Sequence, residues 1–396
     1  MKKDKNILVI TYWSFDNALI QTYTLPYVKQ IRQFTGNGRI YLFTLSQNKK
    51  KVDRHSEQIK ELEAQNIFIL DFTYQKFGPG MLIKMLLIMK YLVLFCWFKR
   101  IAAIHAWCTP GGAIGWLVSL FSFRPLVLDS FEPHAETMVE GGTWSKNGMA
   151  YRLLSRVEKW QLRRARHVIC AAPGMIRHSQ DFYGITKQQY FVKPACVNLE
   201  LFSRNTKLKK QLELKHNVCV YAGKFGGIYL EREVFDFFKV CHDYWKGDFT
   251  VLLLTSHTDS EIENYCRLSG FPGTALVKKF VPHAEVPDYM SLGTFGFCPV
   301  KPLPSKQFCT PIKNGEYWAM GLPVVITRNI SGDSDLIEKE NIGHVLKAET
   351  HEEYLKAVMK IAVLCSEKNL ASRIRLVAER ERNFKDSLEI YRAIYA

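Results

Sequence analysis

One acidic side chain stands out in the stretch FCTPIKNGEYWAMGLPVVIT, residues 308–327, where Glu316 lies between a proline-containing loop and an apolar strand. Ahead of it, Thr310 and Pro311 have the residue types of a helix N-cap and a first-turn proline. The amides that follow should point outward at a helix N-terminus, which attracts anions. These amides belong to Ile312, Lys313 and Asn314.

A phosphate at this helix end would also meet Lys313 as a point charge. Beyond Gly315, Glu316 falls about one turn further along, where a carboxylate can accept hydrogen bonds from hydroxyls of the same ligand. Phosphate plus neighbouring hydroxyls describes a nucleotide ribose. The alternative is that Glu316 only stabilises the dipole of its own helix, and position alone does not separate the two.

A second loop, YAGKFGG, favours the binding interpretation. It follows the first strand of the same predicted domain and combines three glycines with Lys224. Glycines such as Gly223 let the backbone approach a phosphate closely, and a lysine neutralises it. Taken alone the signal is weak, because a glycine-rich turn after a strand is often only a turn and the dinucleotide fingerprint is incomplete.

The stretch PIKNGEYWAMGLPVVIT resembles the signature of retaining GT-B glycosyltransferases of group 1 (family 4 type), which include many enzymes of bacterial surface polysaccharide and lipopolysaccharide synthesis. HVICAAPGMIRHSQDFYGI and KPACVNLELF resemble the end of the acceptor domain and the linker of that family, and KKFVPHAEVPDYMSLGTFGFCPV resembles the middle of its donor domain. The resemblance covers nearly the whole chain.

The resemblance implies a sugar transfer from a UDP- or GDP-linked donor to a glycan or lipid-linked acceptor, with retention and without a metal ion or cofactor. The glutamate matched by Glu316 would hold the donor ribose. His134 would touch the donor sugar or the acceptor hydroxyl, and Lys224 and Lys313 would stabilise charge on the leaving diphosphate. The implied donor-binding residues are Gly223, Lys224, Phe280, Thr310, Pro311, Ile312, Lys313, Asn314, Gly315 and Glu316.

On the acceptor side, the stretch LDSFEPHAETM follows a predicted strand and should turn Glu132 and His134 toward the cleft between the domains. A lone loop histidine is more often a structural hydrogen-bonding group than a catalyst, so both roles stay open for His134. Asp16 and Asn17 in the first loop are weaker candidates, because Asp and Asn are ordinary turn residues.

The sequence also departs from the family pattern. Phe308 occupies the position, eight residues before Glu316, where members often carry a second acid, and FGGIYLEREV lacks the usual second lysine. The first acceptor-side loop reads YWSFDNALIQ instead of a glycine-rich run. Two alternatives therefore stay open: a GT-B sugar-nucleotide epimerase, and a catalytically silent scaffold that binds nucleotide sugar.

The elements that must position these residues form two similar α/β halves. Apolar runs alternate with amphipathic helices from NILVITYW to HVICAAP, and the rhythm restarts at VCVYAGKFGG. We predict two doubly wound Rossmann-like domains facing a central cleft, with ligands beyond the carboxyl ends of the strands. The expected bounds are 1–200 for the acceptor domain, 201–215 for the linker and 216–383 for the donor domain. The helical end, 384–396, should pack back on the first domain.

A length of 396 residues fits two globular domains. The chain carries a formal charge of +16. This charge favours an anionic partner. Acids are mixed among the bases in RVEKWQLRRARHV and RIRLVAERER, so we expect no nucleic acid and prefer an anionic membrane surface. Ten scattered cysteines without metal-ligand spacing, and an N-terminus that carries charges straight into a strand, predict a reduced cytoplasmic location. The basic charge and the apolar segment 81–98 extend this prediction to a peripheral position on the inner face of the membrane.

Two apolar segments resemble membrane spans. Residues 101–123 should instead form a short strand and a short helix separated by TPGG. Residues 81–98 are apolar on nearly every side apart from Lys84 and Lys90. We expect this second segment to be buried within its domain, with contact to a bilayer surface as the alternative, because two central lysines disfavour a full span.

Overall fold

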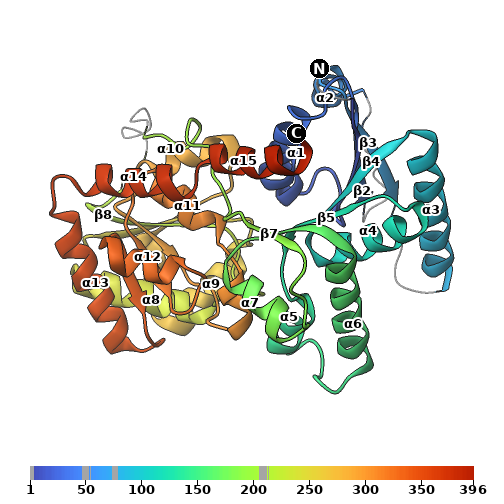
Figure 1. Ribbon diagram of the computed structural model, residues 1–396. Helices are drawn as coiled ribbons and strands as arrows, with labels where there is room; N and C mark the ends of the chain where they lie inside the picture. Colours follow the sequence, from blue (N-terminus) through green and yellow to red (C-terminus); the bar gives the residue numbers. More distant parts are fainter. Residues whose placement is uncertain (1–3, 47–52, 54, 74–78, 205–211, 213) are drawn as a thin grey trace. The chain divides into compact units, whose positions relative to one another are not determined.

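The protein is described by a computed structural model covering residues 4–46, 53, 55–73, 79–204, 212 and 214–396 (Figure 1). Two compact units are found: unit 1 holds residues 1–193 and 385–396, and unit 2 holds 194–384. The predicted pair of doubly wound α/β domains is confirmed. The division falls before residue 200, just after Lys193, which forms an ion pair with Asp129 of unit 1. Most of the expected linker, 201–215, lies outside the described residues.

Unit 1 contains a parallel sheet whose order, over the described residues, is β3-β2-β1-β4-β5-β6-β7. The order reverses between β1 and β4, which is the switch point where ligands of such sheets bind. The inner strands are continuous apolar runs, as expected for strands covered on both faces. The strands are β1 (Asn6–Ile10), β2 (Ile40–Ser46), β3 (Ile67–Thr73), β4 (Ile101–Trp107), β5 (Leu126–Phe131), β6 (Ala165–Cys170) and β7 (Gln189–Val192).

The helices of unit 1 cover this sheet, and α4 packs against both α3 and α6. The chain returns at its end, where α15 joins unit 1 (Figure 1). The helices are α1 (Leu25–Arg32), α2 (Glu57–Ala64), α3 (Pro79–Phe98), α4 (Cys108–Ser122), α5 (His134–Glu140), α6 (Met149–Arg164), α7 (Gly174–Asp181) and α15 (Phe384–Tyr395).

Unit 2 repeats the same winding, with the order β10-β9-β8-β11-β12-β13 over its described residues. Its switch point lies between β8 and β11. Every residue of β9 is buried, and β8 pairs with it in register from Asn217 opposite Phe249 to Ala222 opposite Leu254. The strands are β8 (Asn217–Ala222), β9 (Phe249–Leu254), β10 (Leu276–Lys279), β11 (Phe295–Cys298), β12 (Val324–Thr327) and β13 (Gly343–Leu346).

The helical tail of the sequence is split in two, because the backbone pairs with Val197 at Asn383 instead of continuing the helix. The first part is α14 in unit 2, and the second is α15 in unit 1. The helices of unit 2 are α8 (Arg232–Tyr244), α9 (Asp259–Ser269), α10 (Val286–Met290), α11 (Ile312–Ala319), α12 (Asp333–Glu340), α13 (His351–Cys365) and α14 (Leu370–Glu381).

The two apolar segments have different outcomes. Residues 101–122 form β4 and α4, which confirms the prediction of a strand and a helix, although TPGG begins the helix instead of forming a loop. The expectation that residues 81–98 are buried is wrong. They form α3, which buries one stripe and exposes Leu86, Leu87 and Phe98 among others. A helix that is apolar all round has no periodicity to show which face meets the sheet.

Candidate nucleotide-binding site

The site predicted in unit 2 lies at the carboxyl ends of the strands. Gly223 directly follows β8, at the switch point of the sheet, and its N–H donates to the carbonyl of Leu254 at the end of β9 (2.8 Å). The loop after β8 is tied to the segment after β11 by an antiparallel bridge between Tyr229 and Val300. Parallel winding therefore brings the glycine loop and the segment leading into α11 to one edge.

Helix α11 begins one residue later than the sequence suggests. Pro311, with φ −65° and ψ 123°, occupies the N-cap position, so Thr310 is not the N-cap. Pro311 has the φ that its ring fixes, but its ψ is extended, so it precedes the first helical residue. The amides of Ile312, Lys313 and Asn314 still form the first turn, where backbone N–H groups have no acceptor within the helix.

Lys313 places a buried amine at this edge of the sheet. Its side chain is only 9% exposed. Its Nζ lies 3.7 Å from the ring centroid of Tyr229 and 4.6 Å from that of Tyr221. The described residues offer this amine no hydrogen-bond acceptor. Burial lowers the pKa of Lys313 to about 8, and the nearby Cys298 and Glu316 oppose that shift. A cation is thus held on aromatic faces with its donors unused.

Gly223 is required beside this amine. A Cβ on Gly223 would lie 2.6 Å from Nζ of Lys313, and the backbone φ of +134° is one that other residues rarely adopt. The loop after β8 and the start of α11, predicted separately from sequence, are therefore in direct contact. An anion reaching Lys313 would also face the loop backbone at Gly223.

Glu316 lies three residues further along α11 and is 8% exposed. Its Oε1 is 3.1 Å from Nε2 of His283. His283 begins a short 3₁₀ turn that follows β10, so it approaches from another strand end. The sequence analysis missed this histidine. Its position just after a strand of the same sheet was the available signal.

Asn314 and Gly315 face away from this arrangement. The Nδ2 of Asn314 donates to Oδ2 of Asp333 (2.7 Å), and Asp333 in turn is paired with Arg382. A Cβ on Gly315 would lie 3.3 Å from Cγ of Arg382, so this glycine makes room for the arginine. The Asn314 side chain and the close approach of Arg382 to Gly315 therefore anchor α11, and the Asn314 backbone amide belongs to the first turn of that helix.

Two other predicted donor residues are solvent-exposed. Lys224 follows Gly223 directly, and its carbonyl accepts a hydrogen bond from the hydroxyl of Tyr221 (2.8 Å). Phe280 follows β10 and is 77% exposed. Both lie on loops at the carboxyl edge of the sheet. Within the part of the chain that the structure describes, neither side chain forms a hydrogen bond or ion pair with Lys313 or Glu316, so their proposed roles stay predictions.

The acceptor-side candidates lie at strand ends of unit 1. His134 is the first residue of α5, after β5, and its N–H donates to the carbonyl of Glu132 (2.9 Å). That carbonyl also accepts a hydrogen bond from Oγ1 of Thr109 (2.6 Å). Asp16 is exposed in the loop after β1, and Oδ1 of Asn17 accepts the N–H of Leu19 (2.9 Å) as turn residues do.

A buried acid on α6 stabilises the first turn of α5. Glu158 of α6 accepts the N–H of Ala135 (2.9 Å) and the hydroxyl of Tyr183 (2.7 Å). Burial raises the pKa of Glu158 to about 7, although these hydrogen bonds oppose the rise. The carboxyl group fixes the turn that carries His134, which the sequence analysis did not foresee.

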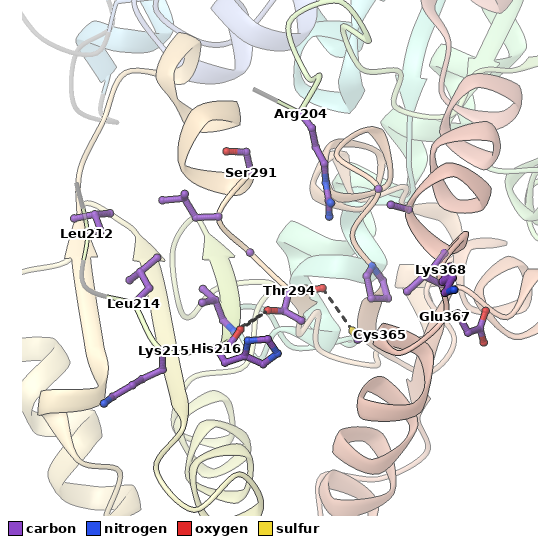
Figure 2. Close-up of a pocket in the computed structure, with 17 residues that line it drawn as sticks. Arg204, Leu212, Leu214, Lys215, His216, Ser291, Thr294, Cys365, Glu367 and Lys368 are labelled. Atoms are coloured by element: carbon purple, nitrogen blue, oxygen red, sulfur yellow. Dashed lines mark hydrogen bonds between the residues drawn. The ribbon is translucent and has the colours of Figure 1, made fainter. Parts of the chain in front are cut away.

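A cavity of about 620 Å³ lies at the opposite edge of the unit 2 sheet (Figure 2). It is lined by residues that precede strands, such as His216 before β8 and Thr294 before β11, together with Cys365 at the end of α13. None of the predicted donor residues lines it. Because ligands of doubly wound sheets bind at the carboxyl ends of the strands, we do not place the nucleotide site there.

No family model and no curated protein matches this sequence. Solved structures do. The chain is 16% identical to sucrose-phosphate synthase from Thermosynechococcus elongatus, with a TM-score of 0.74 and 99% of each chain covered. It is 15% identical to Anabaena HepE in complex with UDP, with a TM-score of 0.72 over 98% of this chain and 99% of that one. These likenesses establish the two-domain GT-B fold.

The third likeness is to a putative UDP-N-acetylglucosamine 2-epimerase from Listeria monocytogenes. It is 10% identical, with a TM-score of 0.60 over 94% of this chain and 91% of that one. The same fold therefore serves an enzyme of a different class, and function must be argued from the site.

Proposed function

We propose that this protein is a glycosyltransferase that moves a sugar from a nucleoside diphosphate to a glycan or lipid-linked acceptor in surface polysaccharide synthesis, on the cytoplasmic side of the membrane. The observation that carries the proposal is Lys313: a buried ammonium for which the described residues provide no acceptor, one helical turn from a carboxylate. The likeness to HepE, solved with UDP, supports a nucleotide-sugar donor.

In this proposal Lys313 and the first amides of α11 bind the diphosphate, and the loop at Gly223 lies against it. Charge develops on the leaving diphosphate as the glycosidic bond breaks, and preorganised donors stabilise such charge most strongly in a site shielded from water. Because the lysine and amides supply the positive charge, the reaction as proposed needs no metal ion.

Glu316 would accept hydrogen bonds from the two ribose hydroxyls, and His283 would fix the orientation of its carboxylate. The acceptor oxygen forms a bond to the anomeric carbon, the bond to the diphosphate breaks, and the departing phosphate takes the acceptor's proton. We also propose retention of configuration, and its support is the resemblance of the α11 segment to retaining enzymes. His134, held by the Glu158 network, is proposed to contact the donor sugar or the acceptor hydroxyl.

The test is calorimetry with UDP and GDP on a Glu316→Ala variant. Hydrogen bonds to a charged group contribute roughly 1.5 to 3 kcal/mol, so the dissociation constant should rise by about tenfold or more. The chain offers a matched control in Glu353, which is also 8% exposed and has Nε2 of His344 3.2 Å from its Oε1. Glu353→Ala should leave affinity unchanged. Unchanged affinity in folded Glu316→Ala would remove that residue from the site.

Two other functions remain testable. The likeness to a putative epimerase supports an enzyme that inverts a centre of the nucleotide sugar without an acceptor. The buried Phe308, in place of a second acid, supports a scaffold without activity. Proton NMR of UDP-glucose and UDP-N-acetylglucosamine incubated with the protein separates them: slow hydrolysis indicates a transferase, a changed sugar an epimerase, and binding without change a scaffold.

A further inference from the structure

Helix α3 carries two apolar stripes on opposite sides. One stripe, which includes Met81, Ile88, Leu92 and Cys96, is buried against unit 1. The other is exposed, and we name it the α3 face. It consists of Ile83, Leu86, Leu87, Tyr91, Leu94 and Trp97. A contiguous exposed apolar surface on a soluble domain marks a site of interaction with another molecule or with a membrane.

The apolar surface continues onto the end of α4. Phe121 and Phe123 are exposed there, and the guanidinium of Arg124 lies 5.3 Å from the ring centroid of Trp97 on α3. The two helices pack against each other. The α3 face is therefore part of a wider exposed patch that includes the aromatic side chains of Phe121 and Phe123. Aromatic side chains suit the boundary between lipid chains and headgroups.

The segment of the chain that contains α3 and α4 carries acidic or basic charge of one sign only. From Phe72 to Leu128 the sequence contains no Asp or Glu, whereas it contains six bases. Lys90 lies within the exposed stripe, and Lys99 and Arg100 are exposed at its end. Basic residues beside an apolar helix attract anionic lipid headgroups. The six bases are Lys76, Lys84, Lys90, Lys99, Arg100 and Arg124.

We propose that the α3 face is a membrane-docking surface that seats unit 1 on an anionic lipid bilayer, with α3 lying in the plane of the interface. Among the described residues α3 alone is long and apolar enough to cross a membrane. Crossing would, however, remove Ile88, Leu92 and Phe95 from the core of unit 1, where they are buried. A helix anchored along one side can only dip its other side into lipid.

A second copy of the chain fits this face poorly. In a two-fold dimer the same surface meets itself. The exposed Lys90, Lys99 and Arg100 would then face their own copies without any acid from this segment to pair with them. Anionic headgroups supply the missing negative charge, and the lysine stem can extend along the apolar surface toward them.

Docking through this face brings the acceptor-side edge of unit 1 near lipid. Nζ of Lys84 donates to Oγ1 of Thr73, the last residue of β3 (2.6 Å), so the first turns of α3 lie at the carboxyl edge of the sheet. Glu132 and Asp16 follow strands at that same edge. The inference rests on exposure and charge, and it holds whichever donor unit 2 binds.

Vesicle flotation with the full chain tests the proposal. We expect binding to phosphatidylcholine vesicles that contain phosphatidylglycerol, weaker binding to phosphatidylcholine alone, and weaker binding at high salt. The variant Leu86→Glu/Leu87→Glu should reduce binding by about tenfold or more, since it places two charges in the apolar layer. The control Val363→Glu/Leu376→Glu changes residues of unit 2 with the same 62% exposure and should bind as the unaltered chain does.

Circular dichroism of both variants confirms folding. Equal binding by the two variants would overturn the proposal, as would equal binding to neutral and anionic vesicles. Light scattering tests whether a second copy of the chain binds the α3 face instead. The face would be assigned to self-association if the unaltered chain is a dimer that does not bind vesicles and Leu86→Glu/Leu87→Glu converts it to a monomer. UDP affinity measured on the same variants should not change.

Discussion

Lys193 of unit 1 and Lys313 of unit 2 are both buried beyond the carboxyl ends of strands, and the two lysines differ in their partners. Lys193 of unit 1 is 1% exposed and Lys313 of unit 2 is 9% exposed. Lys193 forms an ion pair with Asp129 (2.8 Å) and donates to the hydroxyl of Tyr391 (3.0 Å). Lys313 has no acceptor among the described residues. Lys193 is thus neutralised by a carboxylate of its own unit, whereas the described residues supply no such partner for Lys313.

Lys193 belongs to a buried cluster with Asp129, His105 and Tyr391, all of which lie in unit 1. Burial alone would raise the pKa of Asp129, but Lys193 and His105 together hold it well below its usual range. The hydroxyl of Tyr391 also donates to Asp129 (2.8 Å), and Nδ1 of His105 lies 2.7 Å from the hydroxyl of Tyr395. These tyrosines belong to α15, so the cluster fastens the C-terminal helix to the first domain.

The lesson is that a buried charge becomes informative about function only when its partners are counted. A buried ion pair with satisfied hydrogen bonds belongs to the fold, and removing one partner leaves the other uncompensated. A buried ammonium over two tyrosine rings, with unused donors and a lowered pKa, has the features of a binding site.

The largest expected effect is on stability. Lys193→Met leaves Asp129 buried without its cation, so the free energy of unfolding in urea should fall by about 3–5 kcal/mol. Lys239→Met is the control: Lys239 forms only an exposed pair with Asp243 on α8, and its loss should cost about 0.5 kcal/mol or less. Adding Asp129→Leu to Lys193→Met should restore part of the loss. A cost near that of the control would mean that the cluster is not structural.

The next effect is on binding. Lys313→Met removes a buried charge that no carboxylate among the described residues neutralises, so the stability of the ligand-free protein should stay the same or rise. Affinity for UDP should fall by about tenfold to a hundredfold, the equivalent of one charge-assisted hydrogen bond. Urea unfolding and calorimetry on the same sample measure both. A variant that unfolds more easily yet binds UDP normally would make Lys313 a structural residue like Lys193.

The smallest effect is the pH dependence of that lysine. Folding lowers the pKa of Lys313 from its ordinary 10.5 to about 8, so between these values the unfolded chain binds more protons. Burial of the charged Lys313 therefore lowers the free energy of unfolding by its full amount below about pH 8. As pH rises from about 8 to about 10.5, this loss of stability disappears. UDP binding should weaken by about tenfold for each pH unit above 8, with proton uptake on binding. Calorimetry in buffers of different ionisation enthalpy detects the uptake, and Lys313→Met should abolish it.

Much of the fold was predictable because parallel strands that are covered on both faces have continuous apolar sequences, such as that of β9. Such a run can be recognised locally, without knowledge of contacts to residues far along the chain. The start of α11 was predictable to within one residue from Thr310 and Pro311, since proline constrains its own neighbourhood. The burial of α3 was predicted wrongly. Its sequence is apolar on every side, and only the surrounding sheet and helices decide which stripe remains uncovered.

By itself, the sequence determined two α/β domains and one segment, around Glu316, with the residue types of a nucleotide site. Only the tertiary structure decided that Gly223 touches Lys313, that His283 approaches Glu316, and that no described residue accepts a hydrogen bond from the lysine. Local preferences act over a few residues, whereas parallel winding brings together strand ends that lie far apart along the chain. The partners of a buried charge are settled by that winding, and so is the difference between Lys193 and Lys313.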